Sequence, residues 1–286
     1  MTERTVKKVV QGIATQDGAG VKLVRVIGHA DVRDFDPFLM LDAFDSKNPA
    51  DYTKGFPFHP HRGIETVTYL ISGCIEHQDS MGNKGTISDG SCQWMTAGSG
   101  VIHQEMPQAA AHLLGLQLWI NLPQKDKMAE PAYRDLQSAK IPKVAKDDAT
   151  VGIISGSYDG VNSSFTGEYV KTLLLDVDLK ADAEWTLSVP AEDTVFVYIV
   201  DGEAEFEKGG PMLPAKNAVL LSDGDTVCVR TGKDRGVRFV LFSAKPLKED
   251  VAWGGPIVMN TREELHHAFA EISDGTFVKH ARPEQK

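Results

Sequence analysis

Short segments in which apolar and polar residues alternate recur along the whole chain, and they narrow its choice of fold more than any other feature. Examples are residues 21–27, 65–71, 116–120 and 195–200, and glycine-containing turns separate many of them. A two-residue period is typical of half-buried β-strands, and many short strands indicate a sandwich or barrel. Because such segments and Asp-Gly turns occur in both halves, the sequence predicts an all-β chain with a duplicated architecture.

The length of the chain favours two domains, because 286 residues exceed the size of an ordinary single-core domain. Residues 122–143 are rich in charge and proline and show little alternation. We interpret them as a connection in which Lys125, Lys127 and Arg134 are solvated. We therefore expect a first domain over residues 1–135 and a second over residues 136–286.

One segment has helical periodicity. Thr261 is a suitable N-cap, the acidic residues Glu263 and Glu264 follow it, and an apolar stripe begins with Leu265 and Ala268. The sequence therefore predicts a short helix near the C-terminus.

Charge and cysteine content restrict the function classes. A formal net charge of -10 argues against direct nucleic-acid binding, which depends on Lys and Arg displacing counterions. Cys74, Cys92 and Cys228 form no CxxC pair and no even set, which is typical of reduced thiols in the cytoplasm. We find neither a signal peptide nor a stretch near the ~20 apolar residues of a membrane span, so we expect a cytoplasmic protein that binds no membrane.

A candidate metal site begins with His59 and His61, which flank a proline in an expected strand. Residues two apart in a strand point to the same face, so both imidazoles could reach one ion. Taken alone, the pair favours a solvent-facing or core-packed interpretation over a metal site.

A second segment repeats the spacing with His103 and Glu105. If two strands of one barrel carry these pairs, four ligands meet one ion. Three imidazole nitrogens and a carboxylate suit Fe, Mn, Ni, Cu or Zn better than Ca or Mg. An octahedral ion would keep two positions open for substrate and dioxygen, whereas a tetrahedral zinc would give a closed, structural site.

Longer strings carry a family resemblance. HPHRGIE and, some forty residues later, GSGVIHQE resemble the two cupin motifs. The strings DPFLMLDAF, FPFHPHRGIETVTYLISG, EHQDSMGN, QWMTAGSGVIHQEMP and GLQLWINLP resemble the pirin family. The likeness continues through WTLSVPAEDTVFVYIVDGEAEF and VAWGGPIVMNTREEL, so it covers nearly the whole chain.

The resemblance implies two jelly-roll-type cupin β-barrels in tandem with the short C-terminal helix. It also implies one divalent metal in the first barrel, with Fe(II) as the leading choice and Mn, Ni, Cu and Zn as alternatives. The implied ligands are His59, His61, His103 and Glu105. After residue 150 no HxH pair occurs, so we expect no metal in the second barrel.

Glu65 departs from the general cupin pattern, in which the glutamate at this place is a ligand. Since the fourth pirin ligand matches Glu105, we interpret Glu65 as a residue that orients a histidine or a bound water. Glu105 and Glu65 are then the two candidate catalytic bases. A purely structural, hydrogen-bonded carboxylate is the other interpretation of Glu65.

Four further residues near the motifs receive structural interpretations. We expect His77 in a surface turn and His112 in a structural role, and we expect Gln117 and Trp119 in the core or in a pocket wall.

The resemblance leaves more than one function open. Some pirins oxidise the flavonol quercetin as 2,3-dioxygenases, which implies a small aromatic or flavonol-like substrate and dioxygen as partners. Eukaryotic members act as nuclear transcription co-regulators. We therefore expect a metal-dependent dioxygenase, with two alternatives: a non-catalytic, iron-dependent protein-interaction module that regulates transcription or a metabolic enzyme, and a non-oxidative cupin enzyme.

Overall fold

The computed structural model describes residues 2–280, which divide into two compact units. The unit that we call the first barrel consists of Ala14–His29, Phe38–Ser138 and the segment from Leu247 onward. The second barrel consists of the chain up to Ile13, Ala30–Pro37 and Ala139–Pro246. The N-terminal strand thus belongs to the second barrel and the C-terminal helix to the first. The boundary between residues 135 and 136 stays a prediction, and the main transition along the chain follows Ser138.

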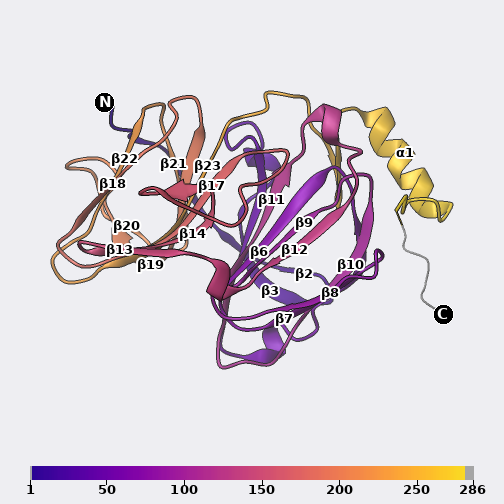
Figure 1. Ribbon diagram of the computed structural model, residues 1–286, viewed down its shortest axis with the longest axis horizontal. Coiled ribbons are helices and arrows are strands. Elements are labelled where there is room, and N and C mark those ends of the chain that lie inside the picture. Colours follow the sequence, from indigo (N-terminus) through magenta and orange to yellow (C-terminus); the bar gives the residue numbers. More distant parts are fainter. Residues whose placement is uncertain (1, 281–286) are drawn as a thin grey trace. The chain divides into compact units, whose positions relative to one another are not determined.

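Two antiparallel sheets form the first barrel (Figure 1). The larger sheet contains, in spatial order, β12 (Ala132–Leu136), β9 (Cys92–Thr96), β6 (Ile64–Ser72), β11 (Leu113–Asn121), β4 (Phe38–Ser46), β3 (Val21–Ile27) and β2 (Ile13–Asp17). The smaller sheet contains β5 (Phe56–His61), β10 (Val101–Pro107), β7 (Ile75–Asp79) and β8 (Lys84–Ile87). The unit also contains the hairpin of β24 (Ala252–Gly254) and β25 (Ile257–Met259), the helix α1 (Arg262–Ser273), and the short 3-10 turns η2 (Pro49–Asp51) and η3 (Gln124–Asp126).

The second barrel is built on one large antiparallel sheet. Its spatial order is β1 (Val6–Gln11), β21 (Asn217–Leu221), β19 (Thr194–Ala204), β23 (Val237–Ala244), β17 (Thr172–Leu179), β14 (Ala149–Ser155) and β13 (Lys143–Lys146), with β20 (Leu213–Pro214) paired to β19. Two strand pairs accompany it: β18 (Glu184–Ser188) with β22 (Thr226–Arg230), and β15 (Ser157–Tyr158) with β16 (Val161–Asn162). Turns η1 (His29–Asp31) and η4 (Ser138–Lys140) lie where the chain changes units. Inward-facing aliphatic and aromatic side chains fill its core.

The predicted fold class is confirmed: residues 2–280 are mostly β, with one α-helix near the end of this range. The four alternating segments lie within β3, β6, β11 and β19. Helix α1 begins at the predicted residue, because the Thr261 side chain accepts a hydrogen bond from the Glu264 backbone N–H and the Glu264 side chain accepts one from the Thr261 N–H. This reciprocal capping satisfies two amide donors that the first helical turn leaves without partners.

The interpretation of residues 122–143 as a plain connection was wrong. Strand β12 pairs with β9 along its full length and forms the edge of the larger sheet. Charged side chains on an edge strand are usual, because they keep its free backbone groups from pairing with another chain. The strand was therefore not predicted, because the charged residues of this segment are as usual on an edge strand as in a connection.

Lys127 was also misplaced by the sequence interpretation, because its side chain is buried, not solvated. Its Nζ lies 2.8 Å from the Gly63 carbonyl oxygen, 2.5 Å from the Asn121 side-chain oxygen and 2.9 Å from the Val258 carbonyl oxygen. Gly63 has a φ of 77°, and a Cβ there would clash with the Val258 carbonyl. Lys127 therefore ties the C-terminal hairpin to the chain just after β5.

Replacing Lys127 with Met is expected to change how stability depends on pH. Burial lowers the pKa of Lys127 to about 7 from its ordinary 10.5, against the opposing charges of Glu249 and Glu264. Between these two values the unfolded chain binds the proton and the folded chain does not, so rising pH stabilises the wild type relative to Lys127→Met. The slope reaches at most about 1.4 kcal/mol per pH unit. Urea unfolding of both proteins from pH 6.5 to 10 measures this pH dependence. If the free energies of unfolding of the two proteins changed in parallel with pH, the prediction would be contradicted.

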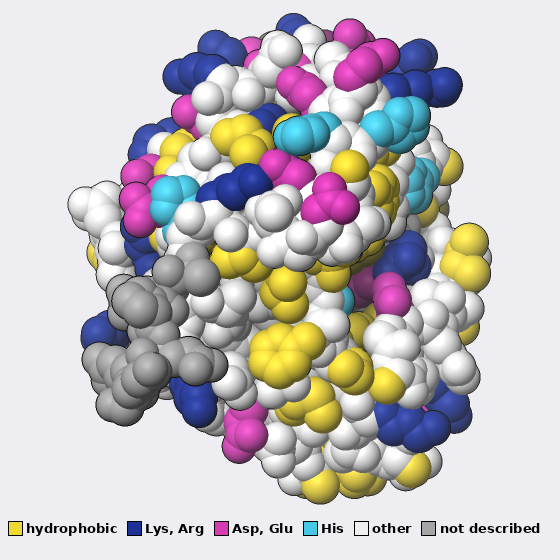
Figure 2. All heavy atoms as spheres, turned by 90° about the vertical axis from the view of Figure 1, so that its right-hand side faces the viewer, with side chains coloured by type: hydrophobic (Ala, Val, Ile, Leu, Met, Phe, Trp, Pro, Cys, Tyr) yellow, Lys and Arg dark blue, Asp and Glu magenta, His cyan; other side chains and the backbone are white. Residues whose placement is uncertain are grey.

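The surface around α1 is mixed in charge. Figure 2 views the molecule from the side of this helix and shows basic, acidic and histidine side chains close together at the top, with hydrophobic groups between charges lower down. Within residues 2–280, no helix combines the length and apolar composition that crossing a bilayer requires.

Candidate metal centre

Three histidines from two neighbouring strands meet inside the first barrel. Strand β5 supplies His59 and His61, and β10 supplies His103, which is the register partner of His59. Their candidate ligand nitrogens all lie within 4.8 Å of one another. The ring centroids are 4.4 Å apart for His59 and His103, 4.8 Å for His59 and His61, and 5.0 Å for His61 and His103. The two histidines of β5 thus lie on the same face of the strand, as their two-residue spacing predicts.

Each of these rings is held through Nδ1. His59 Nδ1 lies 2.9 Å from the Pro57 carbonyl oxygen, and His61 Nδ1 lies 3.1 Å from the Pro256 carbonyl oxygen. A carbonyl only accepts, so both rings carry their proton on Nδ1 and keep the Nε2 lone pair. In His103, Nε2 is buried and has no hydrogen-bond partner, which is costly for a polar atom unless something binds it. The arrangement leaves Nε2 of all three rings for a metal.

Burial keeps the imidazoles in the neutral form that metals require. Loss of solvent and, to a smaller extent, the charge of His59 lower the pKa of His61 to about 3, against the hydrogen bond to Pro256. Burial, followed by the neighbouring histidines, lowers the pKa of His103 well below its ordinary value. Near neutral pH these two rings therefore need not lose a proton to bind a metal.

Glu105 lies one inward position beyond His103 on β10. Its Oε1 accepts a hydrogen bond of 3.0 Å from the Thr68 hydroxyl, which also lies 2.7 Å from the Gln117 side-chain oxygen. Strand β10 has a register irregularity against β5 between His103 and Glu105. Among the described residues the metal-capable cluster comprises the three histidines, and Glu105 lines the cavity beside it. Its role as fourth ligand therefore stays a proposal.

Glu65 lies on β6 and is fully buried. Its Oε1 accepts a hydrogen bond of 2.7 Å from the Thr96 hydroxyl, on the adjacent strand β9. Its part in orienting a histidine or a water stays a prediction.

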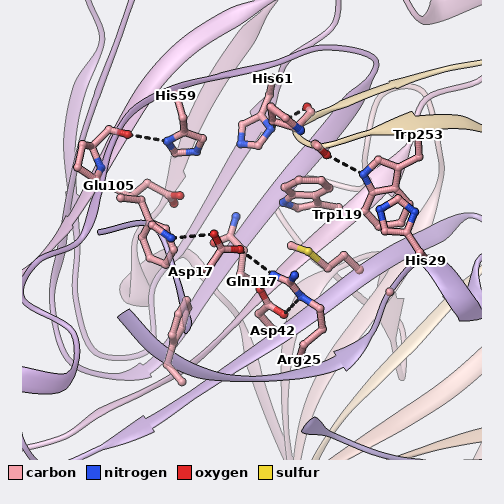
Figure 3. A pocket seen from close by; sticks show the side chains of 18 residues that line it. Asp17, Arg25, His29, Asp42, His59, His61, Glu105, Gln117, Trp119 and Trp253 are labelled. Atoms are coloured by element: carbon pink, nitrogen blue, oxygen red, sulfur yellow. Dashed lines mark hydrogen bonds and ion pairs between the residues drawn. The ribbon is translucent and has the colours of Figure 1, made fainter. Parts of the chain in front are cut away.

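The histidine cluster opens onto a cavity of about 520 Å³ (Figure 3). His59, His61 and Glu105 border one part of it, and Gln117 and Trp119 of β11 form a wall, as predicted for a pocket lining. The lining also includes Asp17, Arg25, His29, Met40, Asp42, Phe44, Phe56 and Trp253. This size lies in the usual range for small-molecule sites, which are mostly apolar with a few placed polar groups.

Aromatic rings form a continuous row along the cavity. The His61 ring lies 4.9 Å from that of Trp119, Trp119 lies 5.8 Å from Trp253, and Trp253 stacks on His29 at 3.7 Å. Near them, Arg25 donates twice to the Asp42 carboxylate, at 2.9 and 2.7 Å. A planar aromatic molecule could stack along such a row, with polar groups at its edge.

The contribution of the C-terminal segment was missed in the sequence. Trp253, Gly255 and Pro256 line the cavity, and the Pro256 carbonyl holds a metal-site histidine from 195 residues away. The string VAWGGP is rich in glycine, proline and tryptophan, which are typical of a special backbone path. No local pattern in that string predicts which barrel it joins.

Two further histidines test the sequence interpretation. The prediction for His77 was wrong, since it lies on β7 and is buried against the Tyr133 ring at 4.3 Å. His112 is structural, as predicted, with Nε2 2.8 Å from the Asp45 carboxylate.

Comparison with known proteins agrees with this architecture. The pirin family model matches residues 20–120, and the model of the pirin C-terminal cupin domain matches residues 174–278. A pirin-like protein of Solanum lycopersicum is 43% identical over 274 residues, covering 95% of this chain and 92% of the relative. Human pirin is 38% identical over 274 residues, covering 93% and 92%.

A solved crystal structure also resembles this chain in its fold. The crystal structure of a quercetin 2,3-dioxygenase from Acinetobacter baumannii matches with a TM-score of 0.88 at 28% identity, covering 97% of this chain and 99% of that one. Both predicted cupin domains are thereby confirmed. Family models over both halves and relatives over nearly the full length lead to one conclusion: the chain belongs to the pirin family.

Proposed function

We propose that this chain is a metal-dependent dioxygenase of the quercetin 2,3-dioxygenase type. One Fe(II) would be held by His59, His61, His103 and Glu105. The observation that carries the proposal is the set of three imidazoles with Nε2 left for a metal, beside a cavity with aromatic walls. The similarity to the Acinetobacter baumannii quercetin 2,3-dioxygenase supports the substrate class, a planar flavonol.

The donor set fits the proposed metal, because neutral imidazoles and a carboxylate suit iron. When bound, the metal would act as a Lewis acid and a template for the substrate oxygen and dioxygen. Thr68 donates to Oε1 of Glu105 and so orients this carboxylate, which would hold the metal and, when the flavonol binds, accept the proton of its hydroxyl. Trp119 and Trp253 would hold the flat ring system and exclude water from it.

The direct test is quercetin turnover by iron-loaded protein. We expect the flavonol absorbance to fall in air and to persist under argon, with the depside and carbon monoxide as products. His61→Ala should abolish the loss. Unchanged absorbance with fully loaded wild-type protein in air would overturn the proposal and favour the interaction-module alternative.

Trp253→Ala is expected to weaken substrate binding more than chemistry. The substitution removes a wall of the cavity and the ring that stacks on His29, but it touches none of the proposed ligands. Loss of one aromatic contact corresponds to about 0.5–1.5 kcal/mol, so KM for quercetin should rise about 2- to 12-fold at similar kcat. Steady-state kinetics measure KM and kcat separately, and an unchanged KM would mean that the flavonol does not contact this wall.

A further inference from the structure

Behind the metal-site histidine His103 lies a second buried histidine with its own carboxylate. His103 Nδ1 is 3.4 Å from His77 Nδ1, and His77 Nε2 is 3.3 Å from Asp79 Oδ2. His103 and Asp79 are register partners on β10 and β7, and all three side chains are buried. The three groups therefore form one line that ends at His103 Nε2, the buried nitrogen without a partner.

Asp79 fixes the direction of the hydrogen bonds. Its Oδ1 accepts from the backbone N–H groups of Met81 and Asn83, both at 2.9 Å, and its Oδ2 accepts from the Asn83 side-chain amide at 2.8 Å. Although burial acts to raise it, hydrogen bonds from His77 and Asn83 leave the pKa of Asp79 below its ordinary value. Asp79 is thus an acceptor only, and His77 Nε2 must be the donor.

The remaining tautomers follow. His103 Nε2 is buried and has no hydrogen-bond partner, so a proton there would be an unsatisfied donor, whereas a proton on His103 Nδ1 is donated to His77 Nδ1. His103 then has no proton on Nε2, and its ring lies 4.4 Å from that of His59 and 5.0 Å from that of His61. We propose that Asp79 and His77 are positioning residues that fix His103 as the Nδ1–H tautomer and so prepare Nε2 to bind the metal, an inference that rests on the proposed metal site.

The surroundings of His77 fit a ring whose orientation matters. The Tyr133 ring stacks on it with an interplanar angle of 23°, and the Tyr133 hydroxyl donates to Asp135 at 2.7 Å and accepts from Gln93 at 3.1 Å. Gly85, the register partner of His77, leaves space for that hydroxyl, since a Cβ there would clash with it. Packing and hydrogen bonds thus restrict both the tilt and the rotation of His77.

The tautomers of His77 and His103 can be determined in the metal-free protein. In metal-free protein labelled with 15N-histidine, long-range proton–nitrogen NMR should show His77 protonated on Nε2 and His103 on Nδ1. In Asp79→Asn, an amide N–H can donate to His77 Nε2. The direction of both hydrogen bonds is then reversed, so His103 should shift toward the Nε2–H form. A wild-type His103 already protonated on Nε2, or a His77 protonated on Nδ1, would overturn the inference.

Metal affinity gives the second measurement, by competition between the protein and a chelator for Fe(II) under argon. His77→Phe fills the space but cannot accept, so affinity should fall about 10- to 100-fold. His77→Gln offers an amide oxygen to His103 and should recover part of the loss. The matched control is His112→Phe, which removes the separate His112–Asp45 pair of the same barrel and should leave affinity unchanged.

The outcomes separate the two proposals. Equal affinity of wild type and His77→Phe would reject the positioning role while leaving the metal site intact. A wild type that binds no transition metal would reject the proposed function, and the NMR arm would still decide the tautomers. Melting curves of the metal-free variants show whether each one is folded, and Asp79→Asn takes the place of His77→Phe if the latter is not.

Discussion

His103→Ala is expected to reduce bound metal from about one ion per chain to background and to lower quercetin turnover by more than about 100-fold. The truncation removes the one cluster nitrogen that is both buried and without a hydrogen-bond partner. It also removes the one imidazole that β10 contributes to the cluster, which leaves His59 and His61 on β5 and the carboxylate of Glu105. Elemental analysis of protein purified after Fe(II) loading measures the metal content.

The control for this prediction is His112→Ala, which changes a histidine of the same barrel outside the cluster and should retain full metal content. Metal binding by His103→Ala at wild-type stoichiometry and affinity would show that the three rings do not act as one site. Near-neutral pH suits the comparison, because burial keeps His61 and His103 uncharged there.

Arg62→Ala is expected to lower the free energy of unfolding by about 3 kcal/mol. The Arg62 side chain is 1% exposed and donates to the carbonyl oxygens of Ser99 at 2.7 Å and Phe277 at 3.0 Å. It also forms an ion pair of 2.6 Å with Glu271 and lies 4.3 Å from the Phe277 ring centroid. Truncation leaves two buried carbonyl groups without this donor.

Urea unfolding of the metal-free protein measures the effect without the contribution of bound metal. Arg62→Lys keeps the charge but not the planar fork, so we expect an intermediate loss. Arg262→Ala, at an exposed position of α1, should stay within about 0.5 kcal/mol of wild type. A stability loss in Arg62→Ala no larger than in this control would contradict the role of Arg62 as a tie to the C-terminal segment.

The features that the sequence predicted well are local ones. The spacing of His59 and His61 decides on which face of a strand the rings lie, and the Thr261 to Glu264 pattern decides where a helix begins. Both follow from residues within a few positions of each other. The same holds for the alternation that predicted β3 and β6.

The features that the sequence interpretation missed depend on distant partners. Lys127 was expected to be solvated, because a lysine in a charged segment usually is. The acceptors around its buried Nζ include the Gly63 and Val258 carbonyls, which lie 64 and 131 residues away in the sequence. His77 was expected at the surface, because it stands next to a probable hairpin turn, and its stacking partner Tyr133 lies in a segment that resembled a connection. In each case the partner was brought close by tertiary structure that no local pattern specifies.

The position of the C-terminal segment in the first barrel has a consequence for synthesis on the ribosome. When Ser138 has been made, all three metal-site histidines exist, but Pro256, which holds His61, and Phe277, which holds Arg62, do not. A nascent chain therefore completes the surroundings of its metal centre only after Pro256 and Phe277 have been translated. Chains that stop before residue 250 carry every histidine of the cluster and still lack the carbonyl that orients His61.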